Sequence, residues 1–182
     1  MRYKIAFLDR DGTINIEKNY LYKIDDFEFL TGVVSGLKLL QDNDFLLVIV
    51  TNQSGIAKGF YTEKDLEILH NWMLNELEQK GVNISKIYYC PHHPNAVVKK
   101  YKKICGCRKP ETGLYWQAIS ELKQEYDIDL EHSIAIGDKE RDLSICNETP
   151  IKGYLINSNF HSSKFICVSD FKNAIEHILK EK

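Results

Sequence analysis

Two aspartates one residue apart, Asp9 and Asp11, are the residues whose types and spacing most directly suggest chemistry in this 182-residue chain. They follow the apolar run Ile5–Leu8, which is typical of a strand buried on both faces of a parallel sheet. Alternation along the strand places both carboxylates on one side, where they repel unless a cation intervenes or one holds a proton. Gly12 follows and can take a positive φ. The segment predicts a Mg²⁺ site, a nucleophile and an acid/base group; the simpler alternative is an Asp-Gly turn.

Two other predicted strands also end in polar residues. Phe45–Val50 is followed by Thr51 and Asn52, and Ser133–Ile136 is followed, after one glycine, by Asp138. The carboxyl ends of parallel strands lie at one edge of a sheet, and ligands of α/β proteins bind there. A hydroxyl group and three carboxylates gathered at that edge would suit a phosphoryl group held together with Mg²⁺.

A phosphate site of this kind also needs a protein cation, and Arg108 and Lys109 are the candidates because they immediately precede a predicted helix. Each feature alone has an ordinary structural explanation. Thr51 could simply end a strand, Lys109 could be a solvated surface charge, and Asp138 could belong to a turn. Their order along the chain favours phosphate chemistry over three unrelated turns.

The elements that must position these residues alternate between strands and helices. Helices are predicted at Val33–Leu40, from a Thr62/Asp65 capping box to about Lys80, from a Thr112 cap to Leu122, and after an Asp170 cap. Further strands are predicted at Ile84–Tyr89, Gly153–Ile156 and Phe165–Val168. This alternation predicts an α/β fold with a doubly wound, mostly parallel, Rossmann-like sheet, in a single domain covering residues 1–182.

A second group of chemically distinctive residues lies in the segment 90–107. Cys90 is followed by His92 and His93, and Cys105 by Cys107, with 12 residues between His92 and Cys105. Two short clusters that supply four sulfur and nitrogen ligands are typical of a closed, tetrahedral, structural Zn²⁺ site. The alternatives are incidental thiols, or a disulfide between Cys105 and Cys107 that such close spacing would strain.

The balance of charges and the short apolar runs argue against nucleic acid and membranes as partners. Lys and Arg number 24 against 26 Asp and Glu, so no net field attracts nucleic acid or an anionic membrane. The longest apolar run, Phe45–Val50, is too short to span a bilayer. We find no export signal, and therefore expect a cytoplasmic protein with reduced thiols. Without a heptad pattern or a large unused apolar stripe, we expect a monomer.

Taken together, these residues resemble the haloacid dehalogenase-like phosphatases. The matching motifs are Asp9-Arg10-Asp11-Gly12-Thr13, Thr51-Asn52, Lys109 and Gly137-Asp138-x-x-x-Asp142. The resemblance implies that Asp9 forms an aspartyl-phosphate and that Asp11 is the general acid and base. It also implies that Thr51 and Lys109 hold the phosphoryl group, and that Mg²⁺ binds the Asp9 carboxylate, the Asp11 main-chain carbonyl and Asp138. Before transfer, Asp9 should then be ionised and Asp11 protonated. The chain has no insert large enough for a cap domain.

The cysteine and histidine pattern is similar to the zinc-containing branch of this superfamily. This resemblance implies zinc bound by Cys90, His92, Cys105 and Cys107, and it selects His92 over His93. It also implies a small sugar bisphosphate as substrate, with the C7 phosphate of a heptose bisphosphate removed during the synthesis of ADP- or GDP-activated heptose. A histidinol-phosphate phosphatase is the second alternative and a nucleic-acid 3′-phosphatase the third. A zinc-stabilised binding module on an inactive phosphatase fold is the non-enzymatic alternative.

The resemblance further implies a set of substrate-binding residues. They are Glu17, Lys18, Asn19 and Tyr20 after the first motif, Asn52, Gln53 and Ser54 after the second strand, Arg108, and Lys139. Arg108 would grip the second phosphate bidentately. The segment 144–150 departs from the small-residue helix usual in relatives, but it contains none of these positions.

Overall fold

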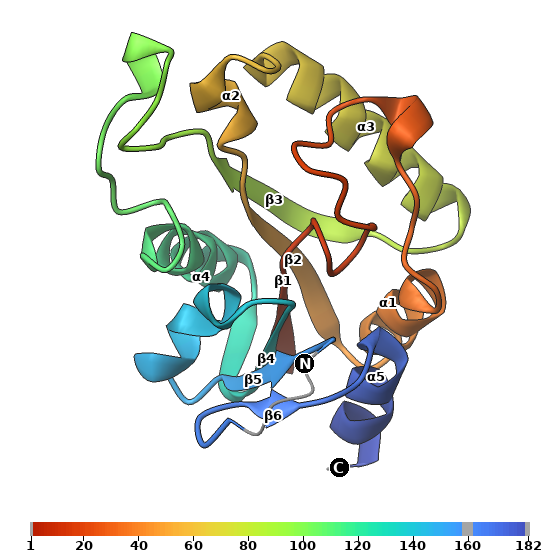
Figure 1. The fold of residues 1–182 in the computed structure, drawn as a ribbon. Helices are drawn as coiled ribbons and strands as arrows, with labels where there is room; N and C mark the ends of the chain where they lie inside the picture. The colour runs from red at the N-terminus through yellow and green to blue at the C-terminus, as the bar shows by residue number, and fades with distance from the viewer. Residues whose placement is uncertain (1, 158–161, 181–182) are drawn as a thin grey trace.

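The computed structural model describes residues 2–157 and 162–180, and in these residues all strand pairs of the sheet are parallel. The strands are β1 (Arg2–Leu8), β2 (Phe45–Asn52), β3 (Ile84–Cys90), β4 (Asp127–Gly137), β5 (Lys152–Leu155) and β6 (Ile166–Cys167). Their order in the sheet is β3-β2-β1-β4-β5-β6 (Figure 1). The chain first adds β2 and β3 on one side of β1, and then adds β4, β5 and β6 on the other side. The predicted doubly wound sheet is therefore confirmed, and β1 lies near its centre.

Alternating residues of β1 contact opposite layers of the molecule. Ile5 and Phe7 pack in the cluster that includes α4 (Gly113–Glu125), whereas Ala6 and Leu8 pack in the cluster on the other face. That second face is covered by α1 (Val33–Gln41), α3 (Glu63–Gln79) and α5 (Phe171–Lys180) (Figure 1). Burial on both faces explains why β1 is a continuous apolar run, and it fixes the strand end that carries Asp9.

The predicted helix caps have different outcomes. Thr62 and Asp65 form the expected capping box at the start of α3, and Asp170 accepts a hydrogen bond from the backbone N–H of Asn173 at 2.8 Å. Thr112 is the N-cap residue of α4, as predicted, but its side chain makes no capping hydrogen bond. Its hydroxyl donates to Glu148 at 3.0 Å.

Several short elements were not predicted. They are α2 (Gly55–Lys58) and the 3-10 helices η1 (Ile24–Asp26), η2 (Lys99–Tyr101) and η3 (Glu140–Asn147). Periodicity does not reveal elements of one or two turns. Of these, η3 matters most for the site, because it carries Asp142 back towards the end of β4. None of the helices in the described parts of the chain combines the length and apolar content needed to cross a membrane.

Candidate active site

The predicted convergence of strand ends is found at the edge formed by β2, β1 and β4. Ala6 of β1 pairs with Leu47 of β2 and with Ile134 of β4, so the three strands end side by side. Asp9 follows β1 directly, and its backbone N–H donates to the carbonyl of Ile136 at 3.1 Å. The site is therefore built on the rigid centre of the sheet.

Gly12 allows the chain to turn close to the third strand end. It has φ = 84°, in the left-handed region, and a Cβ atom there would lie 2.5 Å from Asp138 Oδ2. Both the conformation and the close approach require glycine. This turn brings the first motif against the carboxylate that follows β4.

Lys109 lies at the bottom of the site and is almost completely buried, with 2% of its surface exposed. Its Nζ donates to Asp9 Oδ1 at 2.7 Å and to the Val50 carbonyl at 2.8 Å, and it lies 2.8 Å from Asp142 Oδ1. Burial lowers the pKa of Lys109, but the carboxylates of Asp9 and Asp142 raise it by more, so its pKa lies above the usual value. Lys109 is therefore a cation held against the candidate nucleophile.

Asn52 fixes the backbone of Lys109. Its side-chain oxygen accepts from the Lys109 N–H at 3.0 Å, and its amide donates to the Lys109 carbonyl, also at 3.0 Å. A side chain at the end of β2 thereby holds a residue 57 positions later in the chain. Asn52 was predicted as a substrate-binding residue, and it also lines the cavity described below.

The carboxylates of Asp9, Asp138 and Asp142 gather beside Lys109. One oxygen from each lies within 4.8 Å of the others. Burial and the neighbouring Asp142 carboxylate raise the pKa of Asp9 and Lys109 lowers it, and the net pKa is about 6. Among the described residues, Asp138 Oδ1 is buried without a hydrogen-bond partner. A buried carboxylate oxygen without a donor, next to two further carboxylates, fits a Mg²⁺ site, because Mg²⁺ takes hard oxygen ligands.

Asp142 is the residue of this cluster to which the sequence analysis assigned no role. The signal was present, because Asp142 follows Asp138 by four residues inside the fourth motif. In η3 it is held by the Lys139 backbone N–H, which donates to Asp142 Oδ2 at 3.0 Å. The predicted use of the Asp11 carbonyl as a magnesium ligand stays a prediction.

The Asp11 carboxylate is not part of this cluster and is surrounded by donors. Arg10 Nη2 lies 2.8 Å and 2.9 Å from its two carboxylate oxygens. Asn15 and Gln53 donate to it at 3.0 Å and 2.9 Å. The Arg10 guanidinium also contacts His70 Nε2 at 3.0 Å and is itself fully buried. Arg10 was not among the predicted site residues, although it lies between the two aspartates of the motif.

The environments of the two aspartates shift their pKa values in opposite directions. Burial raises the pKa of Asp11, but the charge of Arg10 and the hydrogen bonds from Arg10, Asn15 and Gln53 together bring it below the usual value. The pKa of Asp9 is raised. The two pKa values therefore lie in the order opposite to the one that an ionised Asp9 and a protonated Asp11 require, because donors surround Asp11 whereas burial and Asp142 act on Asp9. The ionisation states expected before phosphoryl transfer stay a prediction.

A cavity of about 500 Å³ opens above these groups. It is lined by Asp11, Glu17, Asn19, Tyr20, Asn52, Gln53, Ser54, Lys58, Tyr61, His93, Arg108, Lys139 and Arg141. A smaller cavity that shares Asp11 and Lys139 with it contains Asp9, Thr51 and Lys109. The chemistry-bearing residues therefore lie in the small cavity, and the large one offers room for the rest of a substrate.

Most of the predicted substrate-binding residues line the large cavity, but Lys18 does not. The Lys18 ammonium lies 3.6 Å from a carboxylate oxygen of Glu28 instead. The sequence analysis missed four lining residues, which are Lys58, Tyr61, His93 and Arg141. A single cationic or aromatic residue in a loop cannot be distinguished from an ordinary surface residue by its sequence pattern. The cavity presents several cationic side chains, which suits a substrate with more than one anionic group.

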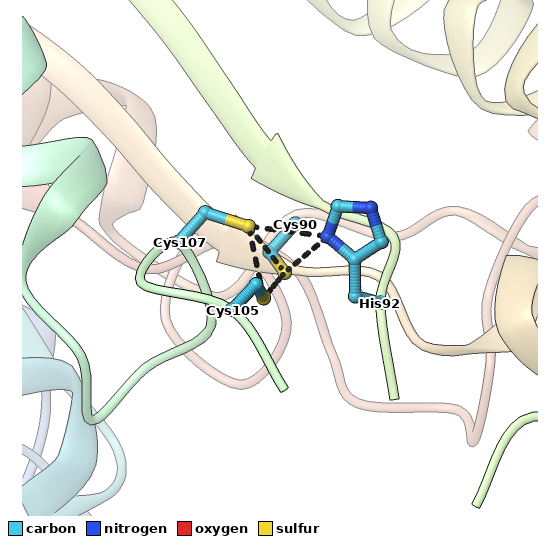
Figure 2. Close-up of side chains that lie close together, drawn as sticks. All are labelled: Cys90, His92, Cys105 and Cys107. Atoms are coloured by element: carbon cyan, nitrogen blue, oxygen red, sulfur yellow. Dashed lines mark hydrogen bonds between the residues drawn. The ribbon is translucent and has the colours of Figure 1, made fainter. Parts of the chain in front are cut away.

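The second predicted cluster also assembles (Figure 2). Cys90 Sγ lies 3.0 Å from Cys107 Sγ and 3.6 Å from Cys105 Sγ, and His92 Nδ1 lies 3.3 Å from Cys107 Sγ. All three thiols are free. Three sulfur atoms and one imidazole nitrogen around a common centre are compatible with zinc. His93 instead lines the large cavity.

Comparisons with known proteins agree with this geometry. A family model described as polynucleotide kinase 3 phosphatase matches residues 4–174. The chain is 46% identical over 142 residues to a D-glycero-alpha-D-manno-heptose-1,7-bisphosphate 7-phosphatase of Photorhabdus laumondii, covering 78% of this chain and 75% of that protein. It is 46% identical over 153 residues to the D-glycero-beta-D-manno-heptose-1,7-bisphosphate 7-phosphatase of Haemophilus ducreyi, covering 84% and 81%.

Solved structures of phosphatases have a similar fold. The D,D-heptose 1,7-bisphosphate phosphatase of B. bronchiseptica, complexed with magnesium and phosphate, superposes with a TM-score of 0.80 at 28% identity, covering 98% of this chain and 99% of that one. A putative haloacid dehalogenase-like phosphatase of Mesorhizobium loti has a TM-score of 0.85 at 25% identity, covering 98% and 85%. The chain belongs to the haloacid dehalogenase-like phosphatases, within the family that the matching model describes.

Proposed function

We propose that the protein is a Mg²⁺-dependent phosphatase that removes the C7 phosphate of D-glycero-D-manno-heptose 1,7-bisphosphate through an aspartyl-phosphate. The observation that carries this proposal is the buried Lys109 ammonium shared by Asp9 and Asp142, in a cluster with the Asp138 carboxylate, one oxygen of which has no hydrogen-bond partner. The printed names of the relatives at 46% identity support the substrate. That residues 1–182 form one domain, acting as a monomer in the cytoplasm, remains a prediction.

The residues that would hold Mg²⁺ are Asp9, Asp138 and Asp142, with the Asp11 carbonyl as the further predicted ligand. The magnesium bound in the related B. bronchiseptica structure supports this assignment. When bound, the cation offsets the negative charge of the phosphoryl oxygens and lowers the pKa of the neighbouring carboxylates. That second effect would ionise Asp9, whose pKa burial and the Asp142 carboxylate otherwise raise.

The reaction proceeds in two displacements. A carboxylate oxygen of Asp9 attacks phosphorus, the bond from phosphorus to the C7 oxygen breaks, and Asp11 gives its proton to the leaving oxygen. Asp11 then takes a proton from water, the resulting hydroxide attacks phosphorus, and the bond to Asp9 breaks to release phosphate. Lys109 and the hydroxyl of Thr51 hold the phosphoryl oxygens in both steps. For the first step Asp11 must carry a proton on one oxygen, which displaces a donor from that oxygen, while the other oxygen can keep the hydrogen bond from Gln53.

We propose that Arg108 binds the second phosphate. Its side chain is half-buried and lines the large cavity. Replacing Arg108 with Ala should raise the KM for the bisphosphate about 10- to 100-fold, since a hydrogen-bonded ion pair is worth roughly 1.5–3 kcal/mol. The KM for p-nitrophenyl phosphate, which has no second phosphate, should change little. Steady-state kinetics on both substrates measures this difference.

Lys123→Ala is the matched control for Arg108→Ala, because Lys123 is an exposed cation on α4 outside the cavity. It should leave both KM values unchanged. An equal rise in KM for both substrates in Arg108→Ala would show that Arg108 does not recognise the second phosphate.

A panel of substrates tests the proposed specificity against its alternatives. The family description names a polynucleotide phosphatase, but a net charge of −2 does not suit a polyanion. Histidinol phosphate is not favoured by the names of the relatives. We expect the highest kcat/KM with one anomer of the heptose bisphosphate, and no turnover without Mg²⁺. A higher value with histidinol phosphate or a 3′-phosphorylated oligonucleotide would contradict the proposed substrate.

We also propose that Zn²⁺ occupies the cluster of Cys90, His92, Cys105 and Cys107, and stabilises the loop that leads to Arg108. The Arg108 guanidinium donates to the carbonyl of His92 at 3.3 Å, so the loop and the substrate cation are in contact. Four ligands and no open position are typical of a structural site.

Replacing Cys107 with Ala should release zinc and lower the melting temperature, because metal binding contributes folding free energy locally. Activity should survive in part, since Asp9 is held by the sheet. Elemental analysis after dialysis and thermal unfolding measure the two effects. Cys167→Ala, which removes a thiol outside the cluster, is the control and should retain zinc. Full zinc content in Cys107→Ala would rule out the proposed ligand set.

A further inference from the structure

The amide of Gln53 joins two parts of the candidate active site. Its Nε2 donates to Asp11 Oδ2 at 2.9 Å and to Thr51 Oγ1 at 2.9 Å. Gln53 is 2% exposed, so water does not compete for these hydrogen bonds. One amide group thus holds both the proposed proton donor and the hydroxyl proposed to contact the phosphoryl group.

The orientation of this amide depends on Tyr61. The Tyr61 hydroxyl donates to Gln53 Oε1 at 2.5 Å, and both residues are buried. An amide rotated by 180° would present its oxygen to the Asp11 carboxylate and lose the hydrogen bond. With the Tyr61 hydroxyl in place, the oxygen of Gln53 is occupied and its NH₂ group faces the active site. The direction of the amide therefore follows from its partners on both sides.

The position of Tyr61 is itself fixed by packing. Its ring stacks on Tyr22 with the centroids 5.1 Å apart and an angle of 15° between the planes. The ring also lies against Gly55, where a Cβ atom would be only 2.1 Å from Tyr61 Cε1. Glycine at position 55 is therefore required by Tyr61 rather than by a turn. Residue 61 follows α2, so that short helix carries the ring back over the end of β2.

We propose that Tyr61 is a positioning residue for proton transfer by Asp11, acting through Gln53. The inference rests on the proposed function and on the role proposed there for Asp11. Tyr61 fixes the Gln53 amide, and the amide holds the Asp11 carboxyl beside the phosphoryl site. Without the Tyr61 hydroxyl, Gln53 can rotate and present its oxygen to Asp11, which misplaces the proton donor for the leaving oxygen.

The test uses the leaving group. An alkoxide leaving from a sugar phosphate needs the proton that Asp11 supplies, whereas p-nitrophenolate leaves without one. Replacing Tyr61 with Phe removes only the hydroxyl and keeps the ring stacked on Tyr22. We expect Tyr61→Phe to lower kcat/KM for an alkyl phosphate about tenfold, the effect of one lost hydrogen bond. The kcat/KM for p-nitrophenyl phosphate should fall by a smaller factor, about threefold or less, because only the displacement of Thr51, which Gln53 also holds, affects both substrates.

A double-mutant cycle tests the route through Gln53. If Tyr61 acts only through that amide, Gln53→Met and the Tyr61→Phe/Gln53→Met double variant should have equal kcat/KM for the alkyl phosphate. Tyr22→Phe, which removes the hydroxyl of the stacked neighbour, should behave as the wild type. Equal losses on both leaving groups, additive effects in the cycle, or an unchanged Tyr61→Phe enzyme would each overturn the proposal.

This test is separable from the test of the proposed substrate. It compares leaving groups within one enzyme, and any alkyl phosphate that the wild type hydrolyses serves in place of the heptose bisphosphate. If the wild type does not hydrolyse the heptose bisphosphate, but Tyr61→Phe lowers kcat/KM selectively for the alkyl phosphate, the proposed substrate is contradicted and the role of Tyr61 is supported. The converse result would support the substrate and contradict that role.

Discussion

Replacing Asp9 with Asn is expected to reduce phosphate release by a factor on the order of 10⁴ or more, because the variant lacks the oxygen that attacks phosphorus. The amide is nearly the same size as the carboxylate, so the fold should survive. Asp9 also lies near Asp142, and removing one of two neighbouring buried carboxylates relieves repulsion. The loss of activity should therefore occur without loss of the folded protein.

Single-turnover and steady-state phosphate release, with and without Mg²⁺, measure the effect of Asp9→Asn. Asp25→Asn makes the same chemical change at an exposed position in η1 and should leave the rate unchanged. Circular dichroism and thermal unfolding separate a folded, inactive variant from an unfolded one. Activity of folded Asp9→Asn within tenfold of the wild type would eliminate Asp9 as the nucleophile.

Replacing Lys109 with Met is expected to affect both activity and stability. Lys109 is the buried partner of Asp9 and Asp142, and its loss leaves two buried carboxylates without their cation. Breaking a buried ion pair from one side costs about 3–5 kcal/mol of unfolding free energy. The proposed contact with the transferring phosphoryl group is lost too, so kcat/KM should fall about 10²- to 10³-fold.

The stability of Lys109→Met should depend strongly on Mg²⁺. If Asp9, Asp138 and Asp142 hold the cation, saturating Mg²⁺ supplies the missing positive charge and stabilises the native state by mass action. Chemical unfolding in EDTA and in excess Mg²⁺ measures this linkage independently of activity. Lys123→Met, at an exposed site on α4, should show neither effect. A Lys109→Met protein as stable as the wild type in EDTA would contradict the buried ion-pair arrangement.

The fold could be predicted largely because the strands are short, apolar and buried on both faces. Ile5–Leu8 and Phe45–Val50 form β1 and β2 as expected, and the capping box places the start of α3 correctly. The prediction for β4 began six residues late, at Ser133 rather than Asp127. The first half of β4 alternates charged and apolar residues, and the register shifts opposite Lys4–Ala6 of β1. An apolar run identifies only the buried half of such a strand.

Site residues that directly follow a strand could be predicted from the sequence. Several site residues that come from loops and helices could not. Asp9, Thr51 and Asp138 could be placed because parallel strands end at one edge. Arg10 and His70 meet through a contact between residues 60 positions apart, which no local pattern encodes. Tyr61 reaches Gln53 only because α2 turns the chain, and a four-residue helix leaves no periodic signal.

The charges and hydrogen-bond donors around each aspartate also could not be predicted from the sequence. The proximity of Asp9 and Asp11 suggests that their pKa values differ, but not in which direction. The direction follows from the donors around Asp11 and from burial and the Asp142 carboxylate at Asp9, and these groups come from segments far apart in the chain. Spacing along the chain therefore identifies candidate groups, whereas the packed environment decides how each one ionises.

Direct trapping of the covalent intermediate tests the central claim. Wild-type protein mixed with heptose bisphosphate and Mg²⁺, quenched in acid and reduced with borohydride, should yield homoserine in place of aspartate at position 9 only, because an aspartyl-phosphate is the reducible acyl group. Peptide mass spectrometry locates the change, and Asp9→Asn and samples without Mg²⁺ should show none. Reduction at another residue, or rapid turnover with no reducible aspartate, would contradict the account.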